Sequence, residues 1–83
     1  MKVHIKYFAS IRETIGVASE TLDTAAATLA ELRDLLAARE GAAGAALARG
    51  RAMRVALNQV MCDESAALHA GCEVAFFPPV TGG

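Results

Sequence analysis

At 83 residues, with 54% hydrophobic residues and no internal linker rich in glycine, proline or serine, the chain is predicted to form one compact domain. A chain of this length buries only about 60 to 65% of its unfolded surface, which leaves little room for both a stable core and a deep catalytic cleft. Eight basic and nine acidic side chains give a net charge of −1 without a basic stripe, which does not favour nucleic-acid binding. These properties favour a carrier, adaptor or partner subunit over a self-sufficient enzyme.

The start of the chain shows no pattern of an export signal. Residues 1–4 enter a strand-like alternation at once, without the apolar segment of a secretory signal. Apolar residues elsewhere recur periodically and never form the run of about 18 or more that spans a bilayer. We therefore expect a cytoplasmic protein with neither a membrane nor a nucleic acid among its partners.

The first predicted elements are a strand, a short connection and a returning strand. Val3, Ile5 and Tyr7 alternate with polar residues, which is typical of a strand with one buried face. Phe8 breaks the alternation, so it is either a core residue at the strand end or an exposed aromatic that binds a partner. A helical or turn-like stretch over residues 10–15 then ends at Gly16, and residues 17–22 form a second strand, which predicts an antiparallel return.

The main helix is predicted to begin after Thr28. Thr28 and Glu31 match a capping box, in which each side chain binds a backbone amide at the helix start. Gly41 is expected to end this helix, and residues 42–48 are expected to be weakly helical or irregular. The stripe that should lie across the sheet consists of Leu29, Leu32, Leu35 and Leu36.

Strand patterns dominate the rest of the chain. A third strand over residues 53–57 leads through an Asn58-Gln59 turn into a short strand over residues 60–62. A loop over residues 63–71 precedes the last strand, residues 72–77. In that last strand, Val74 and Phe76 should occupy one face, with Glu73 and Phe77 on the other.

This order of elements predicts an α+β fold of the ubiquitin-like β-grasp type, with a mixed sheet of four to five strands and one main helix across it. If the first and last strands are neighbours, Phe8 and Phe77 share the face that the helix leaves uncovered, and Met61 lies near the same edge. Such an exposed aromatic patch is typical of a partner-binding surface. The alternative is that both rings pack under a loop.

Residues 1–77 are predicted to form the domain, and residues 78–83 an extended tail. Pro78 and Pro79 fix their own φ and keep the exit from the last strand extended. Six extended residues reach roughly 20 Å, and glycines at the end could pass a channel too narrow for a side chain. The tail would thus carry the carboxylate of Gly83 into a partner. A frayed end is the alternative, although two aromatics and two prolines seldom precede one.

Cysteines and histidines give no sign of a metal site. Cys62 and Cys72 form no Cys-x-x-Cys motif, and His4 and His69 do not extend them into a ligand set. Ordinary, partly buried thiols are expected in a reducing compartment. A persulfide on one of them is the alternative, but neither has a cation or a helix start nearby in sequence to activate it.

The chain resembles the family of small sulfur-carrier subunits of molybdopterin synthase over nearly its whole length. It departs from the family at Cys72, where an aspartate is usual, and at residues 25–27, which are all alanine. The most specific part of the match is residues 73–83, from Glu73 through Phe76-Phe77-Pro78-Pro79-Val80-Thr81 to Gly82-Gly83. The remaining matches are Tyr7-Phe8-Ala9 with Arg12-Glu13, Thr28-Leu29, residues 55–59 and Gly71.

The resemblance implies that an E1-like adenylyltransferase activates the Gly83 carboxylate with ATP. A sulfur donor enzyme then converts it to a thiocarboxylate, and the large synthase subunit receives the tail and transfers the sulfur to a pyranopterin precursor. No cofactor is expected on this chain, and the catalytic groups are expected on the large subunit. Partner binding is expected at Phe8, Arg12, Met61, Phe77, Pro78, Pro79, Val80, Thr81 and Gly82.

Two other functions remain open. A double-glycine end also suits sulfur carriers for thiamine or tRNA thiolation, and protein modifiers that are conjugated to lysines. The second alternative, from a different class, is a β-grasp interaction domain in which the glycines have no role.

Overall fold

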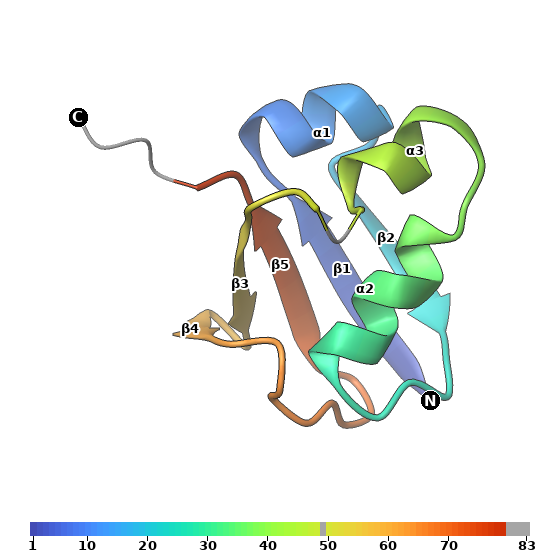
Figure 1. Cartoon of the computed structure of the whole chain (residues 1–83). Helices are drawn as coiled ribbons and strands as arrows, with labels where there is room; N and C mark the ends of the chain where they lie inside the picture. Colours follow the sequence, from blue (N-terminus) through green and yellow to red (C-terminus); the bar gives the residue numbers. More distant parts are fainter. Residues whose placement is uncertain (49, 80–83) are drawn as a thin grey trace.

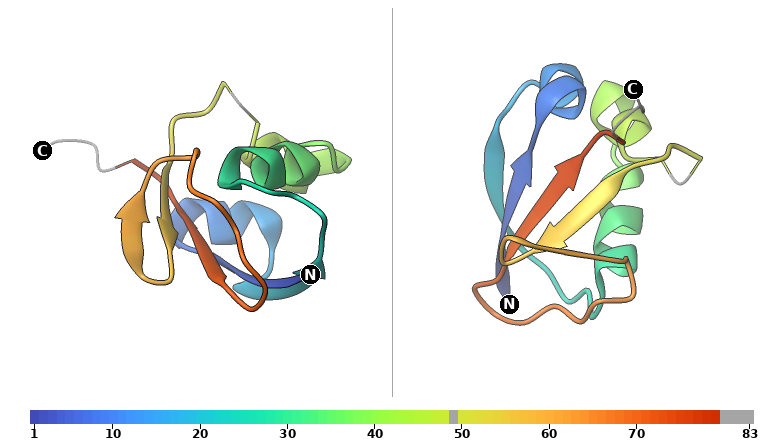
Figure 2. Two further views of the ribbon diagram at one scale, coloured as in Figure 1. Left: turned by 90° about the horizontal axis from the view of Figure 1, so that it is seen from below. Right: turned by 90° about the vertical axis from the view of Figure 1, so that its left-hand side faces the viewer.

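The computed structural model describes residues 1–48 and 50–79, which form a five-stranded mixed sheet with helices on one side (Figures 1 and 2). The predicted ubiquitin-like β-grasp fold is therefore confirmed. The elements in chain order are β1 Lys2–Tyr7, α1 Ala9–Ile15, β2 Ser19–Asp23, α2 Leu29–Ala37, α3 Gly41–Ala46, β3 Arg54–Leu57, β4 Val60–Cys62 and β5 Glu73–Phe77.

The strand order is β2-β1-β5-β3-β4, so the first and last strands lie side by side, which is the condition under which Phe8 and Phe77 were expected to share a face. They run parallel, and their register pairs Ile5 with Val74 and Tyr7 with Phe76. The other neighbours pair antiparallel. Asn58 and Gln59, both with positive φ, form the tight turn between β3 and β4.

The core lies between the sheet and α2. Val3, Ile5 and Tyr7 are buried on one face of β1, as their alternation predicted. The capping box of Thr28 and Glu31 is also confirmed, with each side chain bound to the expected amide. From α2 the core receives Leu29, Leu32 and Leu36.

Leu35 does not belong to this stripe, contrary to the prediction, because its side chain is 52% exposed. At about 100° per residue it points roughly 100° away from the centre of the buried leucines. Arg33 points within about 60° of that centre by the same geometry, and it is the polar residue that α2 buries.

The predicted end of α2 at Gly41 is also wrong. The helix ends at Ala37 with Ala38 as its cap, and Gly41 is instead the first residue of α3. Gly41 has φ near +74°, which lets the chain bend between the two helices at a conformation that a side chain would strain. The alanine-rich segment after it then forms the short helix that the sequence left open.

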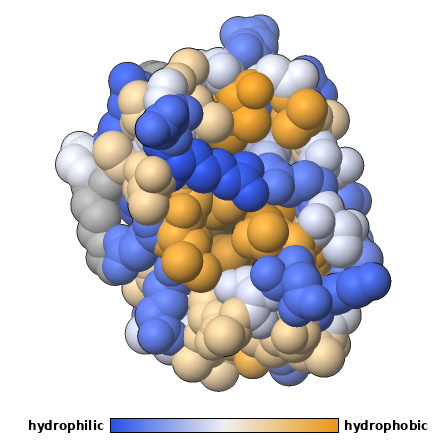
Figure 3. Space-filling view, turned by 90° about the vertical axis from the view of Figure 1, so that its right-hand side faces the viewer, coloured by the Kyte–Doolittle hydropathy of each residue, from blue (hydrophilic) through white to orange (hydrophobic). Residues whose placement is uncertain are grey.

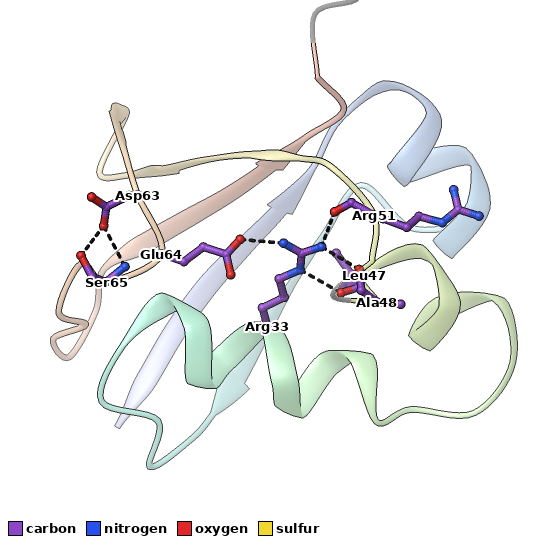
Figure 4. Close-up of polar contacts among 7 residues, drawn as sticks. All are labelled: Arg33, Leu47, Ala48, Arg51, Asp63, Glu64 and Ser65. Carbon is purple, nitrogen blue, oxygen red and sulfur yellow. Dashed lines mark hydrogen bonds and ion pairs between the residues drawn. The ribbon is translucent and has the colours of Figure 1, made fainter.

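Arg33 joins α2 to segments that are distant in the sequence (Figure 4). Its guanidinium donates to the carbonyls of Leu47 at 2.9 Å, Ala48 at 2.7 Å and Arg51 at 2.6 Å. Nη1 also forms an ion pair with Glu64 at 2.6 Å, in the segment after β4. We call these contacts the Arg33 clamp. They position the segment between α3 and β3, and this segment leads directly into Arg54, the first residue of β3.

A second polar cluster joins β1, β2 and the segment after α2. The hydroxyl of Tyr7 donates to Glu20 at 2.7 Å, and Arg39 binds both oxygens of Glu20 at 2.8 and 2.9 Å. The Arg39 hydrogen bonds hold the pKa of Glu20 below its usual range, while burial and the contact with Glu20 raise the pKa of Tyr7.

No helix in the described ranges is long and apolar enough to cross a bilayer.

Candidate functional site: the tail-root groove

A groove of about 310 Å³ lies at the end of β5, where the chain leaves the sheet toward its C-terminal residues. We call it the tail-root groove. The side chains that form it come from the end of β1, from β3 and β4, and from the end of β5. Its lining consists of Phe8, Ala9, Arg54, Met61, Phe77 and Pro78.

The two phenylalanines form the wall of the groove. Phe8 and Phe77 stack with ring centroids 4.6 Å apart and planes 10° from parallel. The register brings them together, because Tyr7 pairs with Phe76 and the next residue of each strand follows on the same side. The amide of Phe8 also donates to the carbonyl of Phe76 at 3.2 Å. The predicted proximity of these rings is confirmed, and their role in binding stays a prediction.

Met61 lies where the sequence placed it, in the lining of the same groove and 52% exposed. The hairpin of β3 and β4 pairs it with Ala56, and Ala56 in turn pairs with Ala75 of β5. Ala56 and Ala75 are buried, while Phe8 and Met61 on this side are 37% and 52% exposed. The result is a shallow apolar surface that is accessible to a partner.

Arg54 and Ala9 are the lining residues that sequence reasoning missed, and Arg54 is the one that carries a charge. It pairs with Phe77 in the β3–β5 register, and its side chain is exposed. The pattern of the β3–β4 hairpin could have placed Arg54 at the groove, since Arg54 lies two positions before Ala56 and therefore on the same sheet face. Among the described residues that line the groove, Arg54 alone has an ionised side chain, and it contributes one positive charge. An apolar surface with a guanidinium suits docking of a partner.

The remaining predicted partner-binding residues are placed differently. Arg12 lies exposed on α1, its amide donates to the carbonyl of Phe8 at 3.4 Å, and it does not line the groove. Pro78 lines the groove and Pro79 follows it, exposed. Val80, Thr81, Gly82 and Gly83 lie outside the described residues, and with them most of the predicted tail.

The two cysteines differ in their burial. Cys72 is buried in the core, and Cys62 is partly buried beside β3. Burial, and then the charge of Asp63, raise the pKa of the Cys62 thiol, which lowers its thiolate fraction at neutral pH. Within residues 1–48 and 50–79, no group of three His, Cys, Asp or Glu side chains is arranged to hold a metal ion.

The sheet order, the helix across it and the groove at the root of the C-terminal segment define a ubiquitin-like β-grasp protein. Residues 5–83 match the model of the ThiS family, and the chain belongs to that family. It is 40% identical over 81 residues to the molybdopterin synthase sulfur carrier subunit of Haemophilus influenzae, an alignment that covers 98% of this chain and 99% of the relative.

Solved structures show the same fold. H. volcanii small archaeal modifier protein 1 superposes with a TM-score of 0.75 at 27% identity, covering 95% of this chain and 98% of that one. A chain from the complex of subunits 1 and 2 of molybdopterin-converting factor from Helicobacter pylori superposes with a TM-score of 0.69 at 30% identity, and both chains are covered completely.

Proposed function

We propose that this protein is the sulfur carrier subunit of a molybdopterin synthase. The observation that carries the proposal is the full-length likeness to the Haemophilus influenzae sulfur carrier subunit at 40% identity. The position of the tail-root groove supports it further, because an exposed aromatic surface at the exit of the C-terminal segment is where a partner that receives that segment would dock.

The proposed reactive group is the carboxylate of Gly83. A carboxylate is a poor acyl donor, so an E1-like adenylyltransferase first joins it to AMP, with ATP as substrate and pyrophosphate as leaving group. Sulfide supplied by a donor enzyme then attacks the acyl carbon and displaces AMP, and one carboxylate oxygen leaves with the phosphate. The resulting thiocarboxylate is largely ionised at neutral pH and therefore nucleophilic, which suits sulfur transfer to a pyranopterin precursor.

The described residues would act by docking. Phe8, Phe77 and Met61 supply apolar area, and Arg54 supplies a positive charge beside it. We propose that the large synthase subunit and the E1-like enzyme both bind this groove, one after the other, while Pro78 directs the segment that follows. The subunit complex of the Helicobacter pylori relative supports a large-subunit partner.

The experiment tests whether the Gly83 carboxylate accepts sulfur. The intact protein is incubated with an E1-like enzyme, ATP and a sulfur donor, and its mass is measured. We expect an oxygen-for-sulfur exchange at Gly83, and none after deletion of Gly83 or addition of one residue behind it. Both variants should keep the wild-type melting temperature, since the domain residues are unchanged. Sulfur incorporation into the extended variant without trimming would contradict the proposal.

A second candidate function is that of a protein modifier, which the likeness to the H. volcanii modifier protein favours. It uses the same activated carboxylate, but the acceptor is a lysine amine and the product is a stable amide. Intact-mass analysis and immunoblotting from the native cell separate the two functions. Free thiocarboxylated protein supports the carrier, and isopeptide-linked conjugates support the modifier.

A further inference from the structure

Ala9 has an unusual backbone conformation at the tail-root groove. Its φ is near +51°, in the left-handed region that residues with a Cβ rarely adopt. Ala9 lines the groove and is exposed, so this conformation occurs where a partner would dock. Strained backbone of this kind clusters at active sites and at sites that bind ligands.

The conformation of Ala9 joins β1 to α1. On one side of it, the amide of Phe8 donates to the carbonyl of Phe76 at 3.2 Å, which continues the pairing of β1 with β5. On the other side, the amide of Ile11 donates to the carbonyl of Phe8 at 3.2 Å, and Ile11 is buried. Ala9 therefore turns the chain between a strand end and a helix that are both held in place, while Phe8 stays stacked on Phe77.

The turn itself does not require an alanine. Glycine has no Cβ and adopts positive φ about as readily as negative φ, so it would form the same turn without strain. The methyl group of Ala9 therefore lowers the stability of the isolated domain. Because Ala9 is exposed, contacts within the domain can offset little of that cost. A contact with a docked partner would offset it.

The coincidence of strain and a groove distinguishes Ala9 from other parts of the surface. A larger hollow of about 620 Å³ lies on the side of β2 and α2, where apolar side chains gather on both sides of a hydrophilic ridge (Figure 3). Among the described residues that line this hollow, none has a positive φ. Two other residues with a Cβ and a positive φ, Asn58 and Gln59, form the β3–β4 turn and do not line the tail-root groove.

The length of the C-terminal segment indicates which partner covers the groove. Pro78 belongs to the lining, Pro79 follows it, and four more residues lead to the end of the chain at Gly83. Four extended residues span at most roughly 14 Å, so a partner that receives the Gly83 carboxylate has to come within that distance of Pro79. Under the proposed function this partner is the large synthase subunit, and its surface would cover the tail-root groove.

We propose that Ala9 is a specificity-determining residue for this partner. Its methyl group contacts one apolar side chain of the large synthase subunit, which enters the groove beside the stacked rings of Phe8 and Phe77. The small size of Ala9 leaves the room that this side chain occupies. The inference rests on the proposed function, which supplies the partner, and it adds that residue 9 selects the size of the inserted group.

Two variants of the full-length protein test the proposal, by calorimetric titration with the purified large synthase subunit and by thermal melts. Ala9→Gly relieves the backbone, so its melting temperature should rise, but the complex loses a buried methyl group, so its affinity should fall about fourfold. Ala9→Asn should fold, because asparagine tolerates the left-handed region, yet its larger, polar side chain should weaken binding by about tenfold or more.

The matched control is Gln59→Gly, because Gln59 also has a positive φ, near +69°, and is exposed outside the groove. This variant should also melt at a higher temperature, but it should bind the large subunit as tightly as the wild type. A purely structural role of Ala9 would not raise stability and lower affinity in the same variant.

The outcomes separate this inference from the proposed function. If the wild type does not bind the large subunit, both fail. If the wild type binds and either Ala9 variant binds as tightly, only the role of Ala9 fails. The same conclusion follows if Gln59→Gly loses as much affinity as Ala9→Gly, or if Ala9→Gly melts at a lower temperature than the wild type, because the methyl group would then stabilise the domain itself.

Discussion

Arg33 and Arg54 carry the same guanidinium in two regions with opposite properties. Arg33 is almost fully buried and binds three carbonyls and Glu64, whereas Arg54 stands exposed in the tail-root groove beside Phe77. Each of the three guanidinium nitrogens of Arg33 donates to a partner within the domain, so the clamp stabilises the fold. The exposed arginine leaves its donors to a partner. The comparison teaches that this small domain separates charge that holds the chain together from charge that is accessible for recognition.

The largest expected effect is on the clamp. Arg33→Met should lower the free energy of unfolding by about 2 to 3 kcal/mol, because Glu64, whose side chain is 25% exposed, loses its cation and three carbonyls lose a donor that is itself buried. Urea denaturation measures this loss. Arg54→Met is the matched control, and we expect its midpoint to stay close to that of the wild type.

The double variant Arg33→Met with Glu64→Leu sharpens the same comparison. Removing both charges should recover part of the lost stability, since an uncompensated, partly buried carboxylate costs more than an apolar replacement of the pair. If Arg33→Met and Arg54→Met were equally destabilised, the distinction between the two regions would be wrong.

The next effect is on the groove. Phe77→Ala should weaken binding to the large synthase subunit by about 2 kcal/mol or more, as for an aromatic at the centre of an interface. The isolated fold should lose less than that, because Phe77 stacks on Phe8 at the surface rather than in the core. Calorimetric titration and a thermal melt give the two quantities. Severe unfolding with unchanged affinity per folded molecule would make Phe77 a core residue.

A smaller effect is expected at Arg54. Arg54→Ala should weaken binding to the same subunit by about 1 kcal/mol and reduce its salt dependence, because a guanidinium at the groove steers an acidic partner surface. Arg54→Lys should recover much of the salt dependence. The melting temperature should not change in either variant, and binding with unaltered salt dependence would exclude a role for this charge.

Local patterns in the sequence predicted most of the fold. Alternation fixed the buried face of β1, the capping box fixed the start of α2, and the neighbouring positions of β1 and β5 followed from the β-grasp order. Stacking of Phe8 on Phe77 followed from the same step. Each of these features depends on a few residues that lie close together in the sequence or that lie opposite each other in two neighbouring strands.

Features that depend on packing at a distance were missed. Helical periodicity places Arg33 nearer to the buried leucines than Leu35, but the partners that allow a guanidinium to be buried come from segments up to 31 positions away. Gly41 matched a helix stop, yet the alanines after it continued as α3. Arg54 belonged to the groove only through the pairing of β3 with β5.

The smallest expected effect concerns the pair of Glu20 and Arg39, which is intermediate between the clamp and the groove because both side chains are partly exposed. Arg39 holds the pKa of Glu20 below its usual range, so folding favours the ionised form. The stabilisation is therefore present above the ordinary glutamate pKa of about 4.3 and is lost as the pH falls through the lower pKa of the folded protein. Solvent limits it to about 0.2 to 1 kcal/mol.

Glu20→Gln tests this sign. At pH 7 the variant should melt slightly below the wild type, and the gap should close on acidification below about pH 4.3, because protonation then removes the same charge from the wild type. Thermal melts across this range measure the gap. Glu40→Gln is the control, since Glu40 is exposed and makes no side-chain bond at the start of α3. A gap that stays constant at all pH values would show that the Glu20 contribution is not electrostatic, and the pair would then differ from the Arg33 clamp in kind rather than in degree of burial.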